Sequence, residues 1–313
     1  MDYGYEANLT TDDNGEISYS ATNAQIAQEV ILTIAFMIGV AADICIFFTI
    51  FCYKRVRTIP NIFLANWAIA DMLCLMVAPS SYRVLSFITH NSLDHNFACV
   101  ISDIGSTLHF TTNVFVIVTL ADWFIGAYFG RASERFHAYY VHVIGTIWTI
   151  SIVVIGVSTS ICFHYFSLLI HHVLITSITY ALVLILVIIF QLSRLIQKLR
   201  KSPFTSSPLI LNLATAYIFC TIFSILMLFV HLLARIESVE VLFFILLFCS
   251  SVVNLALICT FNNDFRSCLM QAVRCTGNQD DGTFDFNNPI RNNQNGSNIS
   301  RRRLSEELLT DIS

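Results

Sequence analysis

The sequence predicts an all-α membrane protein, a bundle of seven transmembrane helices with its N-terminus outside. Of the 313 residues, 56% are hydrophobic and 12% are charged, whereas an ordinary soluble domain carries about 25% charged residues. A soluble core could not bury so much apolar side chain, because a domain of this length still exposes a large surface. The net charge of −4 also argues against nucleic acid as a partner.

Seven stretches are apolar over the roughly 20 residues that a bilayer-spanning helix needs. We expect them to form one bundle domain, 26–261, preceded by an extracellular tail over residues 1–25. The predicted spans, in chain order, cover residues 26–53, 61–87, 98–129, 137–163, 167–199, 209–234 and 239–261.

The chain changes character after the last span. Residues 262–275 predict a short amphipathic helix on the membrane surface, because Phe265, Leu269 and Met270 fall near one helical face. Residues 276–313 carry Asn, Asp, Gly and Arg in place of an apolar run, and this composition predicts a disordered cytoplasmic tail.

The orientation follows from the basic residues. Of the 17 Lys and Arg residues, all except Arg83 and Arg235 lie in the first, third and fifth turns or after the last span. Since cytoplasmic loops of membrane proteins carry an excess of Lys and Arg, this side is predicted to be cytoplasmic. The outside tail then carries an Asn-Leu-Thr sequon, so we expect Asn8 to be glycosylated.

The second span carries a specific pattern directly after a basic turn. It reads Asn-x-x-x-x-Asn-x-Ala-x-Ala-Asp, and its members are Asn61, Asn66, Ala68, Ala70 and Asp71. Asn254 lies near the end of the last span, and the segment after this span opens with Phe265 and Arg266. The spacing from Asn254 to Phe265 matches a known pattern without an insertion or a deletion. Together with Cys99 at the start of the third span and Trp148 within the fourth, these residues resemble the rhodopsin-like family of G-protein-coupled receptors. The resemblance covers roughly residues 26–275.

This resemblance implies a plasma-membrane receptor that passes an extracellular ligand signal to a heterotrimeric G protein, with arrestin and membrane lipid as further partners. In the family, an Asp-Arg-Tyr triplet at the base of the third span faces the G protein. Here the triplet is Asp122-Trp123-Phe124, so the arginine contact is lost. The Pro and Tyr of the last-span motif are replaced by Leu255 and Ile258. These departures keep open a receptor that binds its ligand but signals weakly.

A polar constellation is predicted in the middle of the bundle. Asp71 aligns with the second-span Asp of the family, and Asp43 falls where the first span usually carries Asn, while Thr112, Ser251 and Asn254 fall at positions that line the same pocket. Intramembrane carboxylates are costly and are functional candidates by default. One interpretation is a sodium-linked switch, and the other is a hydrogen-bonded plug that packs the helices. Two neighbouring carboxylates do not both ionise at low cost, so one is expected to hold its proton.

The candidate ligand pocket contains Asp103, His109 and Asn113 of the third span, and Phe223, which stands in for part of the Cys-Trp-x-Pro motif of the family's sixth span. No acid occupies the level at which amine receptors hold an ammonium group, so a biogenic amine is not expected. Apart from a sodium ion at Asp71, no metal is expected, and no cofactor. No catalytic motif occurs, so the chain is not predicted to be an enzyme.

Three kinds of modification are expected. The resemblance implies a disulfide between Cys99 and Cys162, although the family usually pairs the third-span Cys with one in the following extracellular loop. Cys268 and Cys275 are candidates for palmitoylation beside the membrane. Ser305 follows three Arg residues and matches a basic-directed kinase site, where phosphate would help an arrestin-like partner to bind.

Two alternatives come from other classes of membrane protein, a seven-helix chemoreceptor channel subunit and a transporter. Insect-type chemoreceptor channels have the N-terminus inside, which the distribution of Lys and Arg opposes. A transporter built from inverted halves would show an internal repeat, and the sequence shows none by eye.

We expect Asn8→Gln to abolish a glycosidase-sensitive mass shift of the protein expressed in cells, because the sequon lies in the predicted lumenal tail. Gel mobility before and after glycosidase treatment measures the shift. A parent protein without the shift, or an N-terminal tag that antibody reaches only after permeabilisation, would show that the predicted orientation is wrong.

Overall fold

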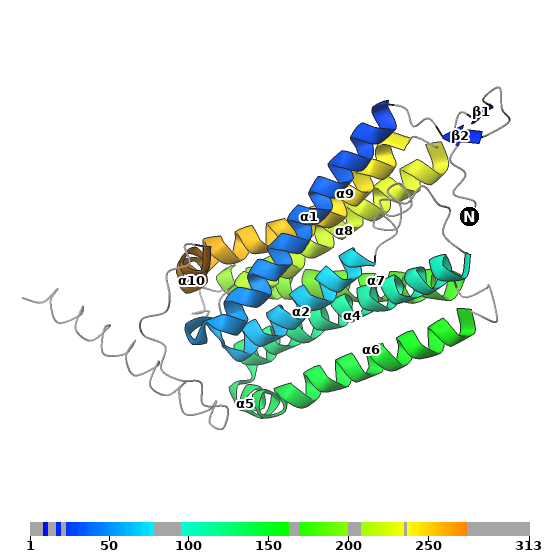
Figure 1. Ribbon diagram of the computed structural model, residues 1–313. Coiled ribbons are helices and arrows are strands. Elements are labelled where there is room, and N and C mark those ends of the chain that lie inside the picture. Colours follow the sequence, from blue (N-terminus) through cyan, green and yellow to red (C-terminus); the bar gives the residue numbers. More distant parts are fainter. Residues whose placement is uncertain are drawn as a thin grey trace, which may run out of the picture. The chain divides into compact units, whose positions relative to one another are not determined.

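The computed structural model describes residues 9–11, 17–19, 23–77, 95–162, 169–199, 208–234 and 237–273. These residues all belong to one compact unit, Met1–Cys275, and the second unit, Thr276–Ser313, lies outside the described residues. The elements (Figure 1) are β1 (Leu9–Thr11), β2 (Ile17–Tyr19), α1 (Asn23–Cys52), η1 (Lys54–Val56), α2 (Ile59–Met76), α4 (His95–Tyr128), α5 (Gly130–Ala138), α6 (Tyr140–Cys162), α7 (Leu169–Leu199), α8 (Leu209–Ala234), α9 (Glu237–Phe261) and α10 (Asn263–Val273).

Seven of the described helices are long and apolar enough to cross a membrane, which confirms the seven predicted spans and describes a multi-pass membrane protein. The apolar segments are Ala27–Cys52, Ile59–Met76, Cys99–Tyr128, Tyr140–Ser160, Ser177–Leu199, Leu209–Met227 and Val241–Phe261. The second helix was predicted to continue to residue 87. It ends at Met76 instead, and residues 78–94 lie outside the described part.

The fourth span begins later than predicted, because a separate short helix precedes it. The predicted start at His137 falls inside α5, and α6 begins at Tyr140. Helix α5 has the sequence GRASERFHA and buries none of its residues. Its charged side chains Arg131, Glu134 and Arg135 are exposed, and so polar a segment is too costly to enter the bilayer as part of a span.

Helix α4 is central to the bundle, where it packs against α2, α5, α6, α7 and α8 (Figure 1). Its inward side chains include Phe115 and Leu120, both fully buried. On the other side of the bundle, α1 packs against α2 and α9, and α8 packs against α9. Gly39 permits the close approach of α1 to α9, because a Cβ atom there would lie 3.1 Å from the Phe248 carbonyl oxygen.

The outer faces of the helices are apolar and exposed. On α6 and α7 the exposed side chains include Ile152, Val153, Ile185 and Ile188. Apolar surface of this extent is unusual for a soluble monomer. It is the surface that hydrocarbon covers in a membrane protein, so these faces are the lipid-facing ones.

Helix α10 forms as predicted, directly after the last span. The Asn262 side-chain oxygen accepts a hydrogen bond from the Phe265 backbone N–H at 3.0 Å, which caps the new helix. The predicted membrane face is only partly correct, because Phe265 is buried against the bundle while Met270 is exposed. Cys268 is also buried, at 3% exposed. An acyl chain on this thiol would require α10 to leave its site, so the prediction of palmitoylation at Cys268 is disfavoured.

A short hairpin precedes α1 and was not predicted. Strands β1 and β2 pair antiparallel, with Thr10 opposite Ser18. Asn8, the predicted glycosylation site, lies just outside the described residues.

The hydrogen bond that joins α6 to α2 connects two of the residues on which the family resemblance rests. The Trp148 indole N–H donates to the Asn66 side-chain oxygen at 2.9 Å, and the Trp148 ring packs on Phe115. Trp148→Phe retains an aromatic ring but removes the donor. We expect the free energy of unfolding to fall by about 0.6–1.7 kcal/mol, the range for hydrogen bonds between membrane helices.

Thermal unfolding in detergent measures this loss, together with Asn66→Ala and the double variant. Because the two side chains share one bond, the double variant should be less destabilised than the sum of the single variants. Thr149→Ala is the control, since this exposed hydroxyl donates only to Gly145 of its own helix. Strictly additive losses would contradict the prediction.

Candidate functional site

Three helices each contribute one polar side chain to a buried cluster in the bundle. The Ser251 hydroxyl oxygen of α9 lies 2.9 Å from Asp43 Oδ2 of α1 and 3.1 Å from Asp71 Oδ2 of α2. Asp43 is 2% exposed, Asp71 4% and Ser251 0%. The structure thus brings together three of the five residues predicted from the sequence, and we call Asp43, Asp71, Ser251 and Asn254 the polar cluster.

The contacts of Ser251 restrict how the two acids are charged. A serine hydroxyl has one hydrogen to donate and two lone pairs that accept. It therefore donates to one carboxyl group only, and its contact with the other is favourable if that group carries a proton and donates to Ser251. If neither acid carries a proton, a cation bound between them would neutralise their negative charge instead. Two bare carboxylates around one hydroxyl would leave a buried charge without a partner.

Asn254 and Thr112 differ in their relation to the two acids. Asn254 lies one turn after Ser251 on α9 and is buried, and its Oδ1 atom has no hydrogen-bond partner among the described residues. The Thr112 hydroxyl is also buried, but it donates to the Leu108 carbonyl of its own helix. Asn254 therefore offers an oxygen that is available to a cation or a water molecule. Thr112 is occupied within α4.

A second buried polar contact joins α8 to α4. The Tyr217 hydroxyl donates to Asn113 Oδ1 at 3.0 Å, and the Tyr217 ring meets Trp67 edge-on at 5.4 Å between centroids. Tyr217 is 2% exposed and was not among the predicted site residues. The signal in the sequence is a tyrosine within an apolar span, because a buried tyrosine hydroxyl usually needs a partner.

The candidate ligand residues have separate surroundings. Asp103 and Asn113 are buried, and the His109 Nδ1 atom lies 3.5 Å from the Cys74 sulfur. Phe223 is 38% exposed and packs beside Phe219 of the same helix, and its place in the pocket stays a prediction.

Helix α8 turns other side chains inward at this level. Thr221 and Ser224 are both buried, and residues three apart lie on the same side of a helix. Phe223 lies one residue before Ser224 and therefore points about 100° away from it.

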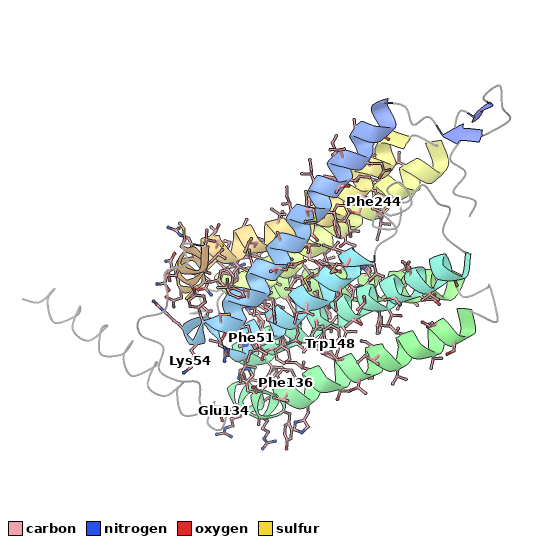
Figure 2. The ribbon with its side chains drawn as sticks, in the orientation of Figure 1. Phe51, Lys54, Glu134, Phe136, Trp148 and Phe244 are labelled. Atoms are coloured by element: carbon pink, nitrogen blue, oxygen red, sulfur yellow. The ribbon has the colours of Figure 1, made fainter. Side chains whose placement is uncertain are left out.

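The end of the bundle formed by η1, α5 and α10 carries most of the described basic residues, and we call it the basic end. Its Lys and Arg residues are Lys54, Arg55, Arg57, Arg131, Arg135 and Arg266. Figure 2 shows Lys54 and Glu134 at this end of the bundle and Phe244 toward the other.

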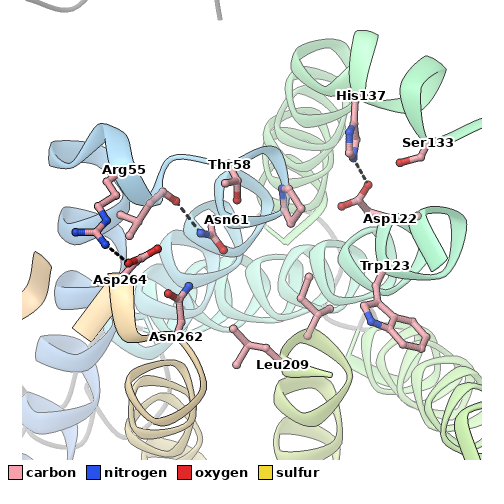
Figure 3. Close-up of a pocket in the computed structure, with 14 residues that line it drawn as sticks. Arg55, Thr58, Asn61, Asp122, Trp123, Ser133, His137, Leu209, Asn262 and Asp264 are labelled. Carbon is pink, nitrogen blue, oxygen red and sulfur yellow. Dashed lines mark hydrogen bonds and ion pairs between the residues drawn. The ribbon is translucent and has the colours of Figure 1, made fainter. Parts of the chain in front are cut away.

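A pocket of about 330 Å³ opens at the basic end (Figure 3). Asp122 and Trp123, both predicted to face a partner, line it, whereas Phe124 stacks on Phe190 with ring centroids 4.7 Å apart. The full lining is Arg55, Val56, Thr58, Pro60, Asn61, Asp122, Trp123, Gly126, Ser133, His137, Leu209, Ile210, Asn262 and Asp264.

One ion pair and one histidine–aspartate hydrogen bond lie on opposite sides of this pocket (Figure 3). On one side Arg55 of η1 contacts Asp264 of α10, and both side chains are exposed. On the other side His137 Nε2 lies 2.7 Å from Asp122 Oδ1. Trp123 adds no charge here, because it is buried and its ring lies 6.0 Å from that of Phe190.

The predicted modification sites are described only in part. Cys99 is disulfide-bonded. The side chain of Cys162 lies outside the described ones, so the Cys99–Cys162 pairing stays a prediction. Cys275 and Ser305 also lie outside the described residues.

Comparison with known proteins gives partial matches to receptors, and no family model matches the chain. The chain is 27% identical to the type-1 angiotensin II receptor A of Xenopus laevis over 96 residues, which is 31% of the chain and 26% of that receptor. It is 25% identical over 91 residues to the type-1 angiotensin II receptors of Meleagris gallopavo and Gallus gallus, covering 29% of the chain and 25% of each. The match thus spans about a quarter of the length of these relatives.

These relatives belong to the rhodopsin-like family and are receptors, not enzymes. The homology and the seven apolar helices together support the family resemblance stated above. They also agree with the expectation that the chain is not an enzyme.

The shared hydroxyl of Ser251 makes a specific stability prediction. Ser251→Ala leaves Asp43 and Asp71 facing each other without a bridging group, so we expect a loss of about 1–3 kcal/mol in the free energy of unfolding, the cost of an unsatisfied buried polar group. Asp43→Asn in the Ser251→Ala background should recover part of the loss, because it removes one acid.

Thermal unfolding of the purified protein measures both effects. Ser250→Ala is a matched control, because this neighbouring buried serine donates only to the Leu247 carbonyl of its own helix. An equal loss for Ser250→Ala and Ser251→Ala, with no recovery by Asp43→Asn, would contradict the proposed bridge.

Proposed function

We propose that this chain is a cell-surface receptor of the rhodopsin-like family that transduces an extracellular ligand signal to a heterotrimeric G protein. The observation that carries the proposal concerns the second-span motif. Asn66 and Asp71 each bond to another helix, Asn66 to Trp148 of α6 and Asp71 to Ser251 of α9. The residues of the resemblance therefore act together in the bundle, and the homology to angiotensin receptors points to the same family.

The basic end is the proposed cytoplasmic face, and its pocket is the proposed site for the G protein. The excess of Lys and Arg there favours this orientation. Basic side chains around a cavity attract an acidic partner and increase its rate of association. A pocket bounded by η1, α4, α5, α8 and α10 changes shape whenever any of these elements moves, so ligand-driven shifts in helix packing would alter it.

The polar cluster is the proposed control point of these shifts. Hard cations prefer oxygen ligands, and the cluster offers two carboxyl groups, the Ser251 hydroxyl and the unpartnered Asn254 oxygen. A sodium ion fits this set of oxygens and would supply the positive charge that the two acids lack. Because the ligating residues come from α1, α2 and α9, an ion bound among them would favour the packing in which these helices meet.

A weakly signalling receptor is a second candidate that one observation favours. Trp123 stands where the family has Arg, and it is buried beside Phe190, so it offers no cation to a partner in the pocket. Under this alternative the ligand binds and the helices rearrange, but coupling to the G protein is poor. The receptor relatives argue against a channel subunit or a transporter.

The proposed ligand is extracellular and is not a biogenic amine. Asp103, His109 and Asn113 remain its proposed contacts on α4. Arrestin and membrane lipid are further proposed partners, and the plasma membrane is the proposed location.

The experiment that tests the function is a ligand screen on cells that express the chain, with G-protein dissociation and arrestin recruitment recorded together. A ligand that triggers G-protein dissociation supports the proposal. A ligand that recruits arrestin without G-protein dissociation supports the weakly signalling alternative. Ligand-gated current in the absence of both signals would contradict the receptor assignment and favour a channel.

The sodium site is tested without knowledge of the ligand. We expect the melting temperature of the purified protein to be higher in NaCl than in choline chloride at equal ionic strength, since a site filled to 100 times its Kd stabilises by about 2.7 kcal/mol. Asp71→Asn should abolish the difference. Asp43→Asn should weaken it if Asp43 is ionised, and leave it nearly unchanged if Asp43 carries the proton.

Asp264→Asn is the control for this experiment, because it also neutralises an acid but lies at the exposed basic end. Its melting temperature should respond to sodium as the parent does. A parent protein that melts at the same temperature in both salts would show that the polar cluster only packs the helices.

A further inference from the structure

The base of α4 holds a buried acid for which its own helix provides no counter-charge. The Asp122 side chain is 2% exposed, and the sequence of α4 contains neither Lys nor Arg. A buried carboxylate that loses its partner is strongly destabilising. Asp122 therefore needs a hydrogen-bond donor from another element.

The donor comes from α5, the short helix that was not predicted. His137 Nε2 lies 2.7 Å from Asp122 Oδ1, although the two residues are 15 apart in the chain. A carboxylate oxygen only accepts, so the imidazole N–H donates in this bond. The His137 side chain is 31% exposed and lines the pocket at the basic end.

Helix α5 has few other attachments to the bundle. None of its residues is buried. Its inward side chains include His137, Ser133, which lines the pocket, and Phe136, whose ring lies 5.8 Å from the ring of Phe63 on α2. A helix of 9 residues with no buried side chain is not stable by itself. Its position against the bundle therefore depends on a small number of such contacts.

The other charges at the pocket are already paired or point elsewhere. Arg55 contacts Asp264 on the opposite side. Within α5, Arg131, Glu134 and Arg135 are exposed. No charge comes from Thr58 before α2, from Pro60 and Asn61 of α2, or from Leu209 and Ile210 of α8. Among the described residues that line the pocket, His137 is thus the group placed to donate to Asp122.

We propose that His137 is a positioning residue that donates a hydrogen bond to the buried Asp122 carboxylate and thereby pins α5 against the base of α4. The pair fixes one wall of the pocket at the basic end. That this wall faces a G protein rests on the proposed function, whereas the pinning itself does not. In this chain the buried acid at the base of α4 thus bonds to the following turn and not to its neighbour Trp123.

Backbone hydrogen exchange of α5 tests the pinning directly. The full-length protein in lipid nanodiscs is compared with Asp122→Ala, His137→Ala and the double variant, and deuterium uptake of residues 130–138 is followed by mass spectrometry. We expect each single variant to exchange at least about tenfold faster in α5, because exchange reports local opening. The double variant should exchange no faster than either single variant, because the two side chains share one interaction.

Two further variants separate the pair from ordinary packing. His137→Lys keeps an N–H donor at this position and should restore most of the protection. His142→Ala is the matched control, since this exposed histidine of α6 lies beside Tyr139 and should leave α5 unchanged. Additive effects of Asp122→Ala and His137→Ala would overturn the proposal. Failure of His137→Lys to restore protection, or an equal effect of His142→Ala, would also overturn it.

G-protein dissociation in cells that express the same variants keeps the two proposals distinguishable. A double variant that exchanges no faster than the single variants, together with altered basal G-protein dissociation, supports both the pinning and the G-protein function. Coupled exchange with no dissociation by any variant or by the parent supports the pinning by His137 and counts against the G-protein function. Additive effects of the two single variants on hydrogen exchange overturn the pinning, whatever the signalling result.

Discussion

The bundle depends on the absence of water from the membrane interior, which makes a buried polar group costly unless it finds a partner within the protein or binds an ion or a water molecule. Ser251 shows this constraint most clearly, because its single hydroxyl serves carboxyl groups from two other helices. Three helices meet at this point, and a change of charge there affects all three. The same constraint makes the cluster responsive, since a proton or a cation changes how many charges the bundle must compensate.

The other interhelical contacts solve the same problem with neutral groups. Trp148 donates to Asn66 between α6 and α2, and Tyr217 donates to Asn113 between α8 and α4. Each bond joins helices whose remaining surfaces are apolar, and apolar surface gains little by leaving lipid for another helix. These few polar contacts therefore contribute to the choice of which helix faces pack, and they are the places where a packing rearrangement would have to break and remake bonds.

The basic end follows a different rule, because it borders water. Here polar contacts lie on opposite sides of a pocket, the Arg55–Asp264 ion pair on one side and the His137–Asp122 hydrogen bond on the other. Trp123 stands where the resembled family has Arg, and Asp122 has a hydrogen-bond partner on α5. This contact ties a surface helix to one wall of the pocket.

The sequence alone was sufficient for the number and place of the spans, for α10 and for the presence of two acids in one region, because span length and composition are set by the thickness of the bilayer. It was not sufficient for the rotation of each helix. Cys268 turned inward, and the Tyr217–Asn113 contact was not foreseen. In a soluble helix the polar face reveals the rotation, but here both the lipid face and the core face are apolar. Rotation is then decided by packing against neighbouring helices, as is the pairing of Asp122 with a histidine 15 residues away.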